Sequence, residues 1–295
     1  MLSGMARIAI IGGGSIGEAL LSGLLRAGRQ AKDLVVAERT PDRAKYLADT
    51  YSVLVTSVTD AVDNATCVVV AVKPGDVESV MGVLARAAAS AENDSAEQVY
   101  VTVAAGITIS YFESKLPAGT PVIRAMPNAA AVVGAGVTAL AKGRFVTEQQ
   151  LDEVSALFDA VGGVLTVPEA HMDAVTALSG SGPAYFFLMV EALVDAGVAA
   201  GLSRQVATDL TAQTLAGSAA MLLERMDEDR RSADGEPLVV RADATAAQLR
   251  ATVTSPGGTT AAALRELERG GLRVAGDAAV QAAKRRSEQL RITSE

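Results

Sequence analysis

Three glycine-rich segments are the parts of this sequence whose residue types and spacing point most directly to chemistry. The first, Gly12–Gly17, fits the pattern G-x-G-x-x-G. The other two, Leu178–Tyr185 and Thr254–Thr260, combine glycines and hydroxyl residues next to helix-like stretches. Backbone N–H groups at a helix start are free to bind anions, so all three segments are candidate anion sites. For the second and third segments, a capped helix–helix turn is the alternative interpretation.

The first segment stands between a strand-like run, 8–11, and a helix-like run, 18–25, as a dinucleotide-binding loop requires. Gly12 would allow the tight turn, Gly14 would let a diphosphate approach the backbone, and Gly17 would let helix and strand pack closely. A purely structural strand–helix turn is the alternative. We predict a dinucleotide site that includes Ile11, Gly12, Gly13, Gly14, Ser15 and Ile16.

The residues that would meet the ribose of such a dinucleotide follow the next strand, about twenty residues further along the chain. Glu38 can accept hydrogen bonds from ribose hydroxyls, which favours NADH. Arg39, Thr40 and Arg43 can instead hold a 2′-phosphate, which favours NADPH. The pattern leaves both coenzymes open. We expect NADPH to be preferred, because two guanidinium groups and a hydroxyl cluster at this point.

The sequence is poor in residues for acid–base, nucleophilic or metal chemistry. It has one histidine, His171, and one cysteine, Cys67. We therefore expect no metal site and no Cys/His or Ser/His catalytic site. His171 is expected to be a surface or helix-cap residue, and Cys67 a buried thiol in a reducing compartment. Lys73, at a strand end beside a proline, is expected to position the coenzyme rather than to serve as an acid.

Composition and charge limit the kind of protein this chain can be. Hydrophobic residues make up 49% and charged residues 20%, which allows a sizeable core. The net charge of −8 argues against a nucleic-acid binder, and the cationic run Lys284–Arg286 fits a solvated helix face. The uncharged stretches 125–141 and 174–190 contain proline or glycine, so we interpret them as buried core rather than as membrane spans. The sequence shows no signal peptide, and we expect a cytoplasmic protein.

Alternating strands and helices must position these residues in the first part of the chain. Continuous apolar runs bounded by turn signals predict strands buried on both faces of a parallel sheet. Their alternation with helices predicts a doubly wound α/β domain of the Rossmann type. The predicted strands are 7–11, 34–37, 53–55, 66–72, 99–103 and 121–124. The predicted helices are 16–26, 41–50 and 77–89, and 90–98 is a predicted surface loop.

From about residue 168 onward, long Ala- and Leu-rich helical patterns replace the strands. We predict an all-α region with helices from Pro183 to about Gly201, from Ser203 onward, at 260–268 and at 277–290. The charged stretch 227–243 is predicted to be a flexible loop. The sequence thus predicts a dinucleotide-binding domain at residues 1–167 and an all-helical domain at residues 168–295. This helical domain has more apolar surface than a small bundle can bury, which predicts a homo-oligomer.

Five segments together resemble the signature segments of the pyrroline-5-carboxylate reductase family. In chain order they are Ala71–Pro74, Ala105–Ile107, Met126–Asn128, Asp173–Tyr185 and Thr254–Thr260. Their order and spacing match along nearly the whole chain. The resemblance implies an NAD(P)H-dependent oxidoreductase of proline biosynthesis, which reduces 1-pyrroline-5-carboxylate to L-proline by hydride transfer. It also implies dimers formed through the helical, substrate-binding domain, often assembled into decamers.

The resemblance also implies roles for individual residues. Asn128 would border the nicotinamide end of the cleft, and the Thr260 hydroxyl would lie near the ring nitrogen as the candidate catalytic group. The substrate carboxylate would be held by the backbone N–H groups of Gly257, Gly258 and Thr259. The coenzyme would be lined by the two strand ends made of Ala71, Val72, Lys73, Pro74, Ala105, Gly106 and Ile107.

This sequence departs from the family pattern shortly before the Thr254–Thr260 segment. The family usually carries a His-Pro pair and an Arg-Asp pair there. Here the corresponding residues are Asp243-Ala244-Thr245 and Leu249-Arg250-Ala251. Because of this departure, the family pattern does not predict where the local helix begins or whether a subunit contact forms there. The glycine-rich segment itself is intact.

Reduction of a protonated cyclic imine suits a chain with so few acid–base residues. The imine carbon is already electrophilic when its nitrogen is protonated, so positioning supplies most of the rate. A 2-hydroxy-acid dehydrogenase would instead need a His or Lys to remove the hydroxyl proton. Two alternatives remain: another imine reductase or β-hydroxyacid dehydrogenase-like enzyme, and a non-catalytic dinucleotide sensor.

Overall fold

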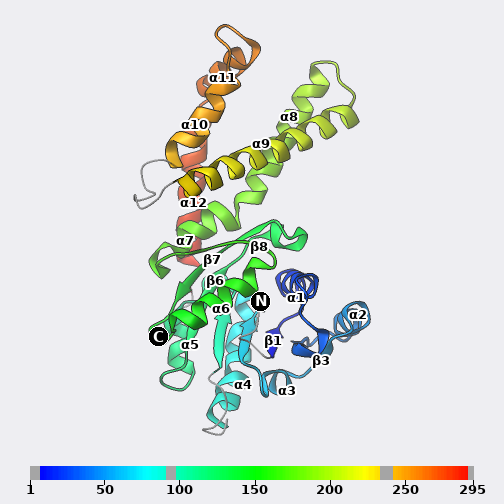
Figure 1. Cartoon of the computed structure of the whole chain (residues 1–295), viewed down its shortest axis with the longest axis vertical. Helices are drawn as coiled ribbons and strands as arrows, with labels where there is room; N and C mark the ends of the chain where they lie inside the picture. The colour runs from blue at the N-terminus through cyan, green and yellow to red at the C-terminus, as the bar shows by residue number, and fades with distance from the viewer. Residues whose placement is uncertain (1–6, 91–97, 233–241, 292–295) are drawn as a thin grey trace. The chain divides into compact units, whose positions relative to one another are not determined.

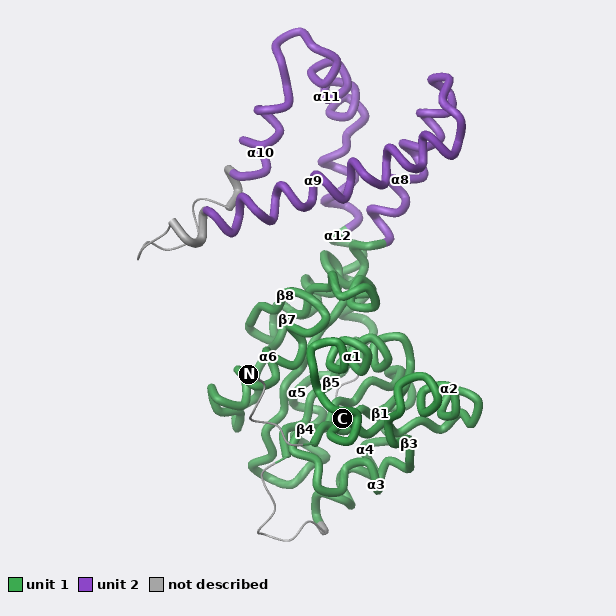
Figure 2. Tube along the Cα trace, turned by 45° about the vertical axis from the view of Figure 1, so that its right-hand side comes forward, with its two compact units in different colours: residues 1–183, 280–295 green, residues 184–279 purple. Residues whose placement is uncertain are grey.

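The computed structural model of the chain describes residues 7–90, 98–232 and 242–291. The contacts divide the chain into two compact units (Figure 2). Unit 1 comprises residues 1–183 and 280–295, and unit 2 comprises residues 184–279. The last helix of the chain therefore begins in unit 2 and ends in unit 1.

Unit 1 is built on an 8-stranded sheet with the order β3-β2-β1-β4-β5-β6-β7-β8 (Figure 1). All neighbouring strands are parallel except β6 and β7, which are antiparallel. The strands are β1 Ile8–Ile11, β2 Leu34–Ala37, β3 Leu54–Thr56, β4 Cys67–Val70, β5 Val99–Thr102, β6 Val122–Met126, β7 Gly136–Lys142 and β8 Gly162–Thr166. The predicted doubly wound α/β domain is confirmed, with one antiparallel pair that the prediction of a parallel sheet did not include.

Each central strand contributes to two apolar cores, one on each face of the sheet. In β1, Ile8 and Ile10 belong to one core and Ala9 and Ile11 to the other. This alternation explains why the strand is apolar throughout. The first core includes side chains of α1 Ser15–Arg26, α2 Pro41–Tyr51 and α6 Glu148–Asp159. The second includes side chains of α3 Val58–Val62, α4 Val77–Ser90 and α5 Ile109–Lys115.

The predicted elements of the first part agree with the structure to within two residues at each end. The structure adds β7, β8, α3, α5 and α6, which the sequence patterns did not predict. The predicted surface loop at 90–98 falls mostly on residues 91–97, which lie outside the described residues, and Ser90 is the last residue of α4. Cys67 is fully buried in β4, as predicted, and its burial raises the pKa of the thiol to about 12.

The end of α12 (Leu272–Gln289) is tied to the start of α7 (Met172–Val175) within unit 1. Asp173 is 1% exposed and accepts hydrogen bonds from Ser287 Oγ at 2.7 Å and Arg291 Nε at 2.8 Å. Burial by itself would raise the pKa of Asp173. The hydrogen bonds from Ser287 and Arg291, together with the positive charges of Arg291 and Arg124, outweigh that effect and lower its pKa. A charged, buried carboxylate therefore fixes the C-terminal helix.

An Asp173→Asn variant is expected to lower the free energy of unfolding by about 2 kcal/mol at pH 7, since it removes a buried, charge-assisted contact. Because the pKa of Asp173 is lowered in the folded chain, its contribution is full at neutral pH and is lost as pH falls through that lowered value. The difference between wild type and variant should therefore shrink below the ordinary aspartate pKa of 3.8.

Urea unfolding at a fixed protein concentration, repeated from pH 7 to about pH 2.5, measures this difference. Asp277→Asn is a suitable control, because Asp277 is an exposed residue of the same helix. A deficit for Asp173→Asn that stayed constant with pH would contradict the assignment of a charged Asp173.

The described residues of unit 2 form helices joined by turns and contain no strand. α8 (Gly182–Ala199) and α9 (Arg204–Ser232) are joined at Gly201, whose φ of +104° suits glycine, and the Ser203 hydroxyl caps α9 by accepting from Val206 N at 3.3 Å. α10 (Ala242–Thr252) and α11 (Thr259–Arg269) follow. The predicted loop at 227–243 is wrong at both ends, because α9 continues to Ser232 and α10 begins at Ala242; residues 233–241 lie outside the described residues.

Candidate functional site

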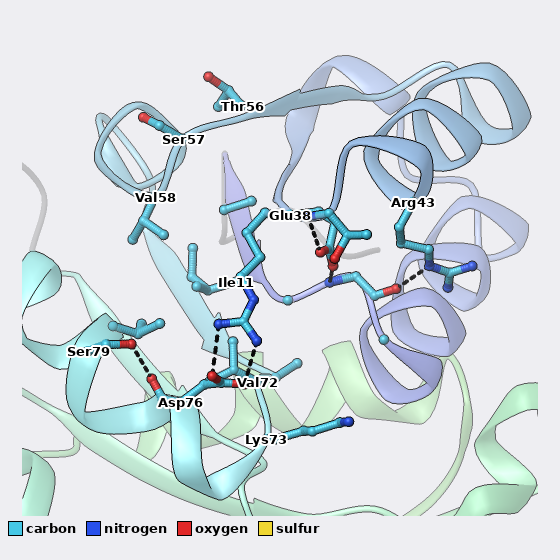
Figure 3. A pocket seen from close by; sticks show the side chains of 18 residues that line it. Ile11, Glu38, Arg43, Thr56, Ser57, Val58, Val72, Lys73, Asp76 and Ser79 are labelled. Atoms are coloured by element: carbon cyan, nitrogen blue, oxygen red, sulfur yellow. Dashed lines mark hydrogen bonds and ion pairs between the residues drawn. The ribbon is translucent and has the colours of Figure 1, made fainter.

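The strand order of unit 1 reverses between β1 and β4, where consecutive crossovers leave in opposite directions. Open α/β sheets form a ligand crevice at such a point, outside the carboxyl ends of the strands. A cavity of about 470 Å³ lies there in this chain, within the range of small-molecule sites (Figure 3). Nine of the predicted coenzyme residues line it: Ile11, Gly12, Gly13, Gly14, Arg39, Thr40, Ala71, Val72 and Lys73.

Gly12, in the loop after β1, and Gly17, in the first turn of α1, have the backbone roles that the sequence predicts. Gly12 has a φ of +107°, and a Cβ there would lie 2.8 Å from the carbonyl oxygen of Ala71. A Cβ at Gly17 would collide with the carbonyl oxygen of Gly12. A Cβ at Gly14, in contrast, would meet no atom within 4 Å. Gly12 and Gly17 are therefore required by the fold, whereas Gly14 leaves open space for a ligand.

The first turn of α1 offers N–H groups to that space. Gly14 is the N-cap residue and has no side chain to bond to the helix start. The first hydrogen bond within the helix runs from Glu18 N to Gly14 O at 2.8 Å. The N–H groups of Ser15 and Ile16 come before this bond and therefore have no carbonyl partner within the helix. A diphosphate fits these donors and the positive end of the helix dipole. The residues present thus suit a dinucleotide.

Glu38, at the end of β2, is turned toward the glycine loop. Its two carboxylate oxygens accept from Gly13 N at 3.0 Å and Thr40 N at 2.8 Å. Burial would raise the pKa of Glu38, but these two backbone hydrogen bonds outweigh it and lower the pKa. The carboxylate is therefore ionised at neutral pH, and both of its oxygens already hold the backbone around the cavity (Figure 3).

The two arginines near Glu38 differ in how firmly they are held. Arg43 donates from Nε to the carbonyl oxygen of Gly13 at 2.7 Å and pairs with Glu18, whose other oxygen accepts from Tyr51. Arg39 makes a two-point ion pair with Asp76, and its side chain is 78% exposed. Arg43 thus belongs to the loop scaffold, while Arg39 reaches over the cavity.

Several cavity residues were not predicted from the sequence. Thr56 ends β3 and Ser57 and Val58 follow it, while Asp76, Ser79 and Val80 come after β4 along the chain. A signal for the first three was available, because the ends of neighbouring parallel strands share one edge of a sheet. Asp76 carries no such signal, since its pairing with Arg39 depends on the tertiary fold.

The other predicted coenzyme residues lie outside this cavity. Ser15, Ile16 and Pro74 adjoin its lining residues in sequence, and Ala105 is exposed after β5. Gly106 and Ile107 are buried, and a Cβ at Gly106 would lie 2.6 Å from the carbonyl oxygen of Leu290. This contact links the loop after β5 to the end of α12.

Asn128 has a fixed orientation after β6. Its Oδ1 accepts from Val137 N at 3.2 Å, and its Nδ2 therefore faces Ser179 Oγ, at 3.5 Å. Ser179 belongs to the π-helical turn Thr176–Gly180, a distortion that often marks functional positions. His171, the single histidine, is exposed at the N-cap position of α7 and makes no side-chain cap bond there.

In unit 2, the predicted carboxylate site is the start of α11. Gly257 has a φ of +69°, which favours glycine, and Gly258 is the N-cap residue without a side-chain cap. Gly258 N donates to Ser255 O at 3.0 Å, so this N–H closes the turn. The first hydrogen bond within the helix runs from Ala262 N to Gly258 O at 3.1 Å. The N–H groups of Thr259 and Thr260 come before this bond and therefore have no carbonyl partner within the helix.

Comparison with known proteins identifies the family. Residues 169–290 match the model of a pyrroline-5-carboxylate reductase dimerisation domain. Residues 7–106 match the model of a coenzyme F420-dependent NADP oxidoreductase. A pyrroline-5-carboxylate reductase of Mycobacterium tuberculosis (strain ATCC 25618 / H37Rv) is 82% identical over 295 residues, 100% of both chains. This chain belongs to the pyrroline-5-carboxylate reductase family.

Solved structures agree with this assignment. A pyrroline-5-carboxylate reductase from Coxiella burnetii has 33% identity and a TM-score of 0.85, with 98% of this chain and 99% of that chain covered. A pyrroline carboxylate reductase from Plasmodium falciparum, solved with NADP bound, has 26% identity and a TM-score of 0.76 and covers 97% and 98% of the two chains. The chain is an NAD(P)H-dependent oxidoreductase that reduces 1-pyrroline-5-carboxylate to L-proline, and its first domain is of the NADP-binding type.

The helical region is a dimerisation domain, which confirms the predicted homodimer.

One stretch, Glu169–Ala199, has the length and a mean hydropathy (1.3) typical of a membrane span, which by itself is weak evidence for one. Our interpretation of 174–190 as buried core is wrong for the single chain, because only 11% of the most apolar window in this stretch is buried. Phe187 and Leu188 are 65% and 68% exposed. A second copy of the chain accounts for such a surface.

Proposed function

We propose that the start of α11 binds the carboxylate of 1-pyrroline-5-carboxylate. The observation that supports this most directly is a helix start with free Thr259 and Thr260 N–H groups, a glycine cap and no acidic residue in its first turn. Such a start attracts a small anion and leaves room for it. Gly257 and Gly258 contribute a backbone turn that a side chain would hinder, and Gly257 N–H is a further donor.

We propose that the coenzyme binds along the cavity of unit 1. Ile11 to Ile16 would hold its diphosphate, and Ala71 to Pro74 and Ala105 to Ile107 would line it along the strand ends. Asn128, held by Val137 N, would border the nicotinamide. When bound, the reduced nicotinamide supplies the hydride.

The chain's own residues then need to position the substrate rather than to transfer a proton with a strong acid. We propose that the Thr260 hydroxyl, in the first turn of α11, orients the protonated ring nitrogen while the neighbouring N–H groups hold the carboxylate. Two fixed points on a small ring define which carbon faces the hydride. The exposed His171 and the fully buried Cys67 take no part in this step.

We propose that NADPH is preferred over NADH. Glu38, which would favour a free ribose 2′-hydroxyl, has both oxygens bonded to backbone N–H groups, whereas Arg39 and the Thr40 hydroxyl stand at the same strand end. The test is the ratio of kcat/KM for NADPH over NADH with 1-pyrroline-5-carboxylate as substrate. A ratio well above one is expected, and a strong NADH preference would contradict the proposal.

We further propose that the dimers assemble into a larger homo-oligomer such as a decamer, that the functional domain boundary lies near residue 168, and that the enzyme is cytoplasmic. The boundary is supported by β8, which ends at Thr166 and is followed in the described residues only by helices. A free, buried Cys67 suits a reducing compartment.

Sedimentation equilibrium of the purified chain tests the proposed assembly, because it distinguishes a dimer from a decamer by mass. A pure dimer at all concentrations would exclude the larger assembly.

A further inference from the structure

Two residues that line the coenzyme cavity, Arg39 and Asp76, form an ion pair that the reaction itself does not use. Arg39 Nη1 lies 2.9 Å from Asp76 Oδ1, and Arg39 Nη2 lies 3.2 Å from Asp76 Oδ2. Arg39 follows β2 and Asp76 follows β4, and β1 lies between these strands in the sheet. The pair therefore joins the segments after β2 and β4, the two strands on either side of β1, and both residues line the cavity.

The two partners differ in mobility. Asp76 N donates to Lys73 O at 2.9 Å, and Asp76 O accepts from Ser79 Oγ at 2.9 Å, so this backbone is fixed between a 3-10 turn and the start of α4. Its neighbour Val77 is 1% exposed. The Arg39 side chain, in contrast, is 78% exposed and long. A competing anion would therefore draw Arg39 away and leave Asp76 in place.

Arg39 is also the guanidinium that is available to an anionic ligand. Two of the three guanidinium nitrogens of Arg43, Nε and Nη2, are bonded to the Gly13 carbonyl oxygen and to Glu18. The planar fork of an arginine binds a carboxylate or a phosphate in the same two-point geometry. Asp76 thus offers Arg39 the interaction that a phosphate would offer.

We propose that Asp76 limits the preference of this chain for NADPH by competing with the 2′-phosphate of NADPH for Arg39. This inference rests on the proposed use of NADPH at the end of β2. Asp76 lowers the affinity for NADPH in two ways, because it holds Arg39 and because its own negative charge repels the phosphate. NADH carries no 2′-phosphate, so the competition for Arg39 does not affect it. Asp76 therefore reduces the discrimination between the two coenzymes.

Binding of 2′,5′-ADP and of 5′-ADP, measured by calorimetry on the full chain, isolates the contribution of the 2′-phosphate. Asp76→Asn is expected to bind 2′,5′-ADP about threefold to tenfold more tightly and 5′-ADP unchanged, as the loss of one exposed ion pair and one repulsion implies. Asp42→Asn is the matched control, since Asp42 is an exposed acid in the first turn of α2 and its loss changes the net charge equally. It should change the affinity less than twofold.

A double-mutant cycle completes the test. In an Arg39→Ala background, Asp76→Asn should lose most of its effect on 2′,5′-ADP, because the competition requires Arg39. If Arg39→Ala weakens 2′,5′-ADP but Asp76→Asn does not strengthen it beyond the Asp42→Asn control, the inference on Asp76 is overturned and the coenzyme proposal stands. If Arg39→Ala leaves the preference for 2′,5′-ADP intact, the proposed phosphate contact is overturned as well.

Discussion

Replacing Gly14 with valine is expected to weaken NADPH binding by about tenfold or more, equivalent to at least ~1.4 kcal/mol, while the chain remains folded. The physical reason is specific to this glycine. A Cβ at Gly14 meets no atom of the protein within 4 Å, and its backbone φ of −69° is open to any residue. The added side chain would instead occupy the space through which a diphosphate approaches the α1 amides.

Titration of the coenzyme's own fluorescence measures this affinity, and the chain contains no tryptophan that would overlap with the signal. Gly163→Val is the matched control, because a Cβ at Gly163 also meets no atom within 4 Å and a strand tolerates valine. Both variants should melt within a few degrees of wild type. Unchanged NADPH affinity in Gly14→Val would remove the glycine loop from the coenzyme site.

Replacing Thr260 with alanine is expected to lower kcat by about tenfold to a hundredfold, the range for loss of one orienting group in a reaction centre. Thr260 is the second residue of α11, where alanine is a good helix former, so the helix should persist. The backbone N–H groups remain, and the substrate carboxylate should still bind. The dissociation constant of NADPH should be unchanged, because the coenzyme is proposed to bind in unit 1.

Steady-state kinetics with 1-pyrroline-5-carboxylate, together with NADPH titration, separates these effects. Thr260→Ser keeps the hydroxyl and should retain most of kcat. If alanine and serine variants were equally impaired, packing of the threonine methyl group would be the cause. A Thr260→Ala enzyme with wild-type kcat would show that the hydroxyl does not orient the substrate.

The sequence predicted the strands that are apolar on both faces, and it failed where that pattern is absent. β8 begins with Gly162 and Gly163, residues that strands usually avoid, and β7 lies mostly in the uncharged, alanine-rich stretch 125–141, which shows no strand alternation. β7 is antiparallel to β6 and parallel to β8, so its placement depends on tertiary pairing rather than on a local pattern. The short helix α3 has only 5 residues, too few for a periodic signal.

The helical domain shows a different limit. The sequence predicts α8, α9 and α11, but it does not predict α10, and α12 begins five residues before the predicted start at 277. The sequence also does not show that 174–190 is exposed, because an apolar stretch has the same pattern whether it faces the chain's own core or a second copy. The exposed Phe187 and Leu188 reveal the difference only in the folded chain. The charged stretch after Asp227 continues α9, and its glutamate and arginine residues are good helix formers.

In the candidate site, the glycine pattern predicted the loop after β1, while the bonding of Glu38 and Gly258 could not be predicted. Glu38 was considered as a ribose ligand, yet its oxygens hold the backbone at Gly13 and Thr40. Gly258 was expected to offer its N–H to the substrate, yet this N–H bonds to Ser255 O. Both outcomes depend on local backbone geometry that residue types alone do not specify.

A crystal structure of the dimer with NADPH and L-proline bound is the most direct test of the account. We predict the proline carboxylate on the N–H groups of Thr259 and Thr260, the ring nitrogen at the Thr260 hydroxyl, and the reacting ring carbon about 3–3.5 Å from the nicotinamide carbon that carries the hydride. A proline carboxylate bound away from α11, or a nicotinamide too distant from the ring for hydride transfer, would contradict it.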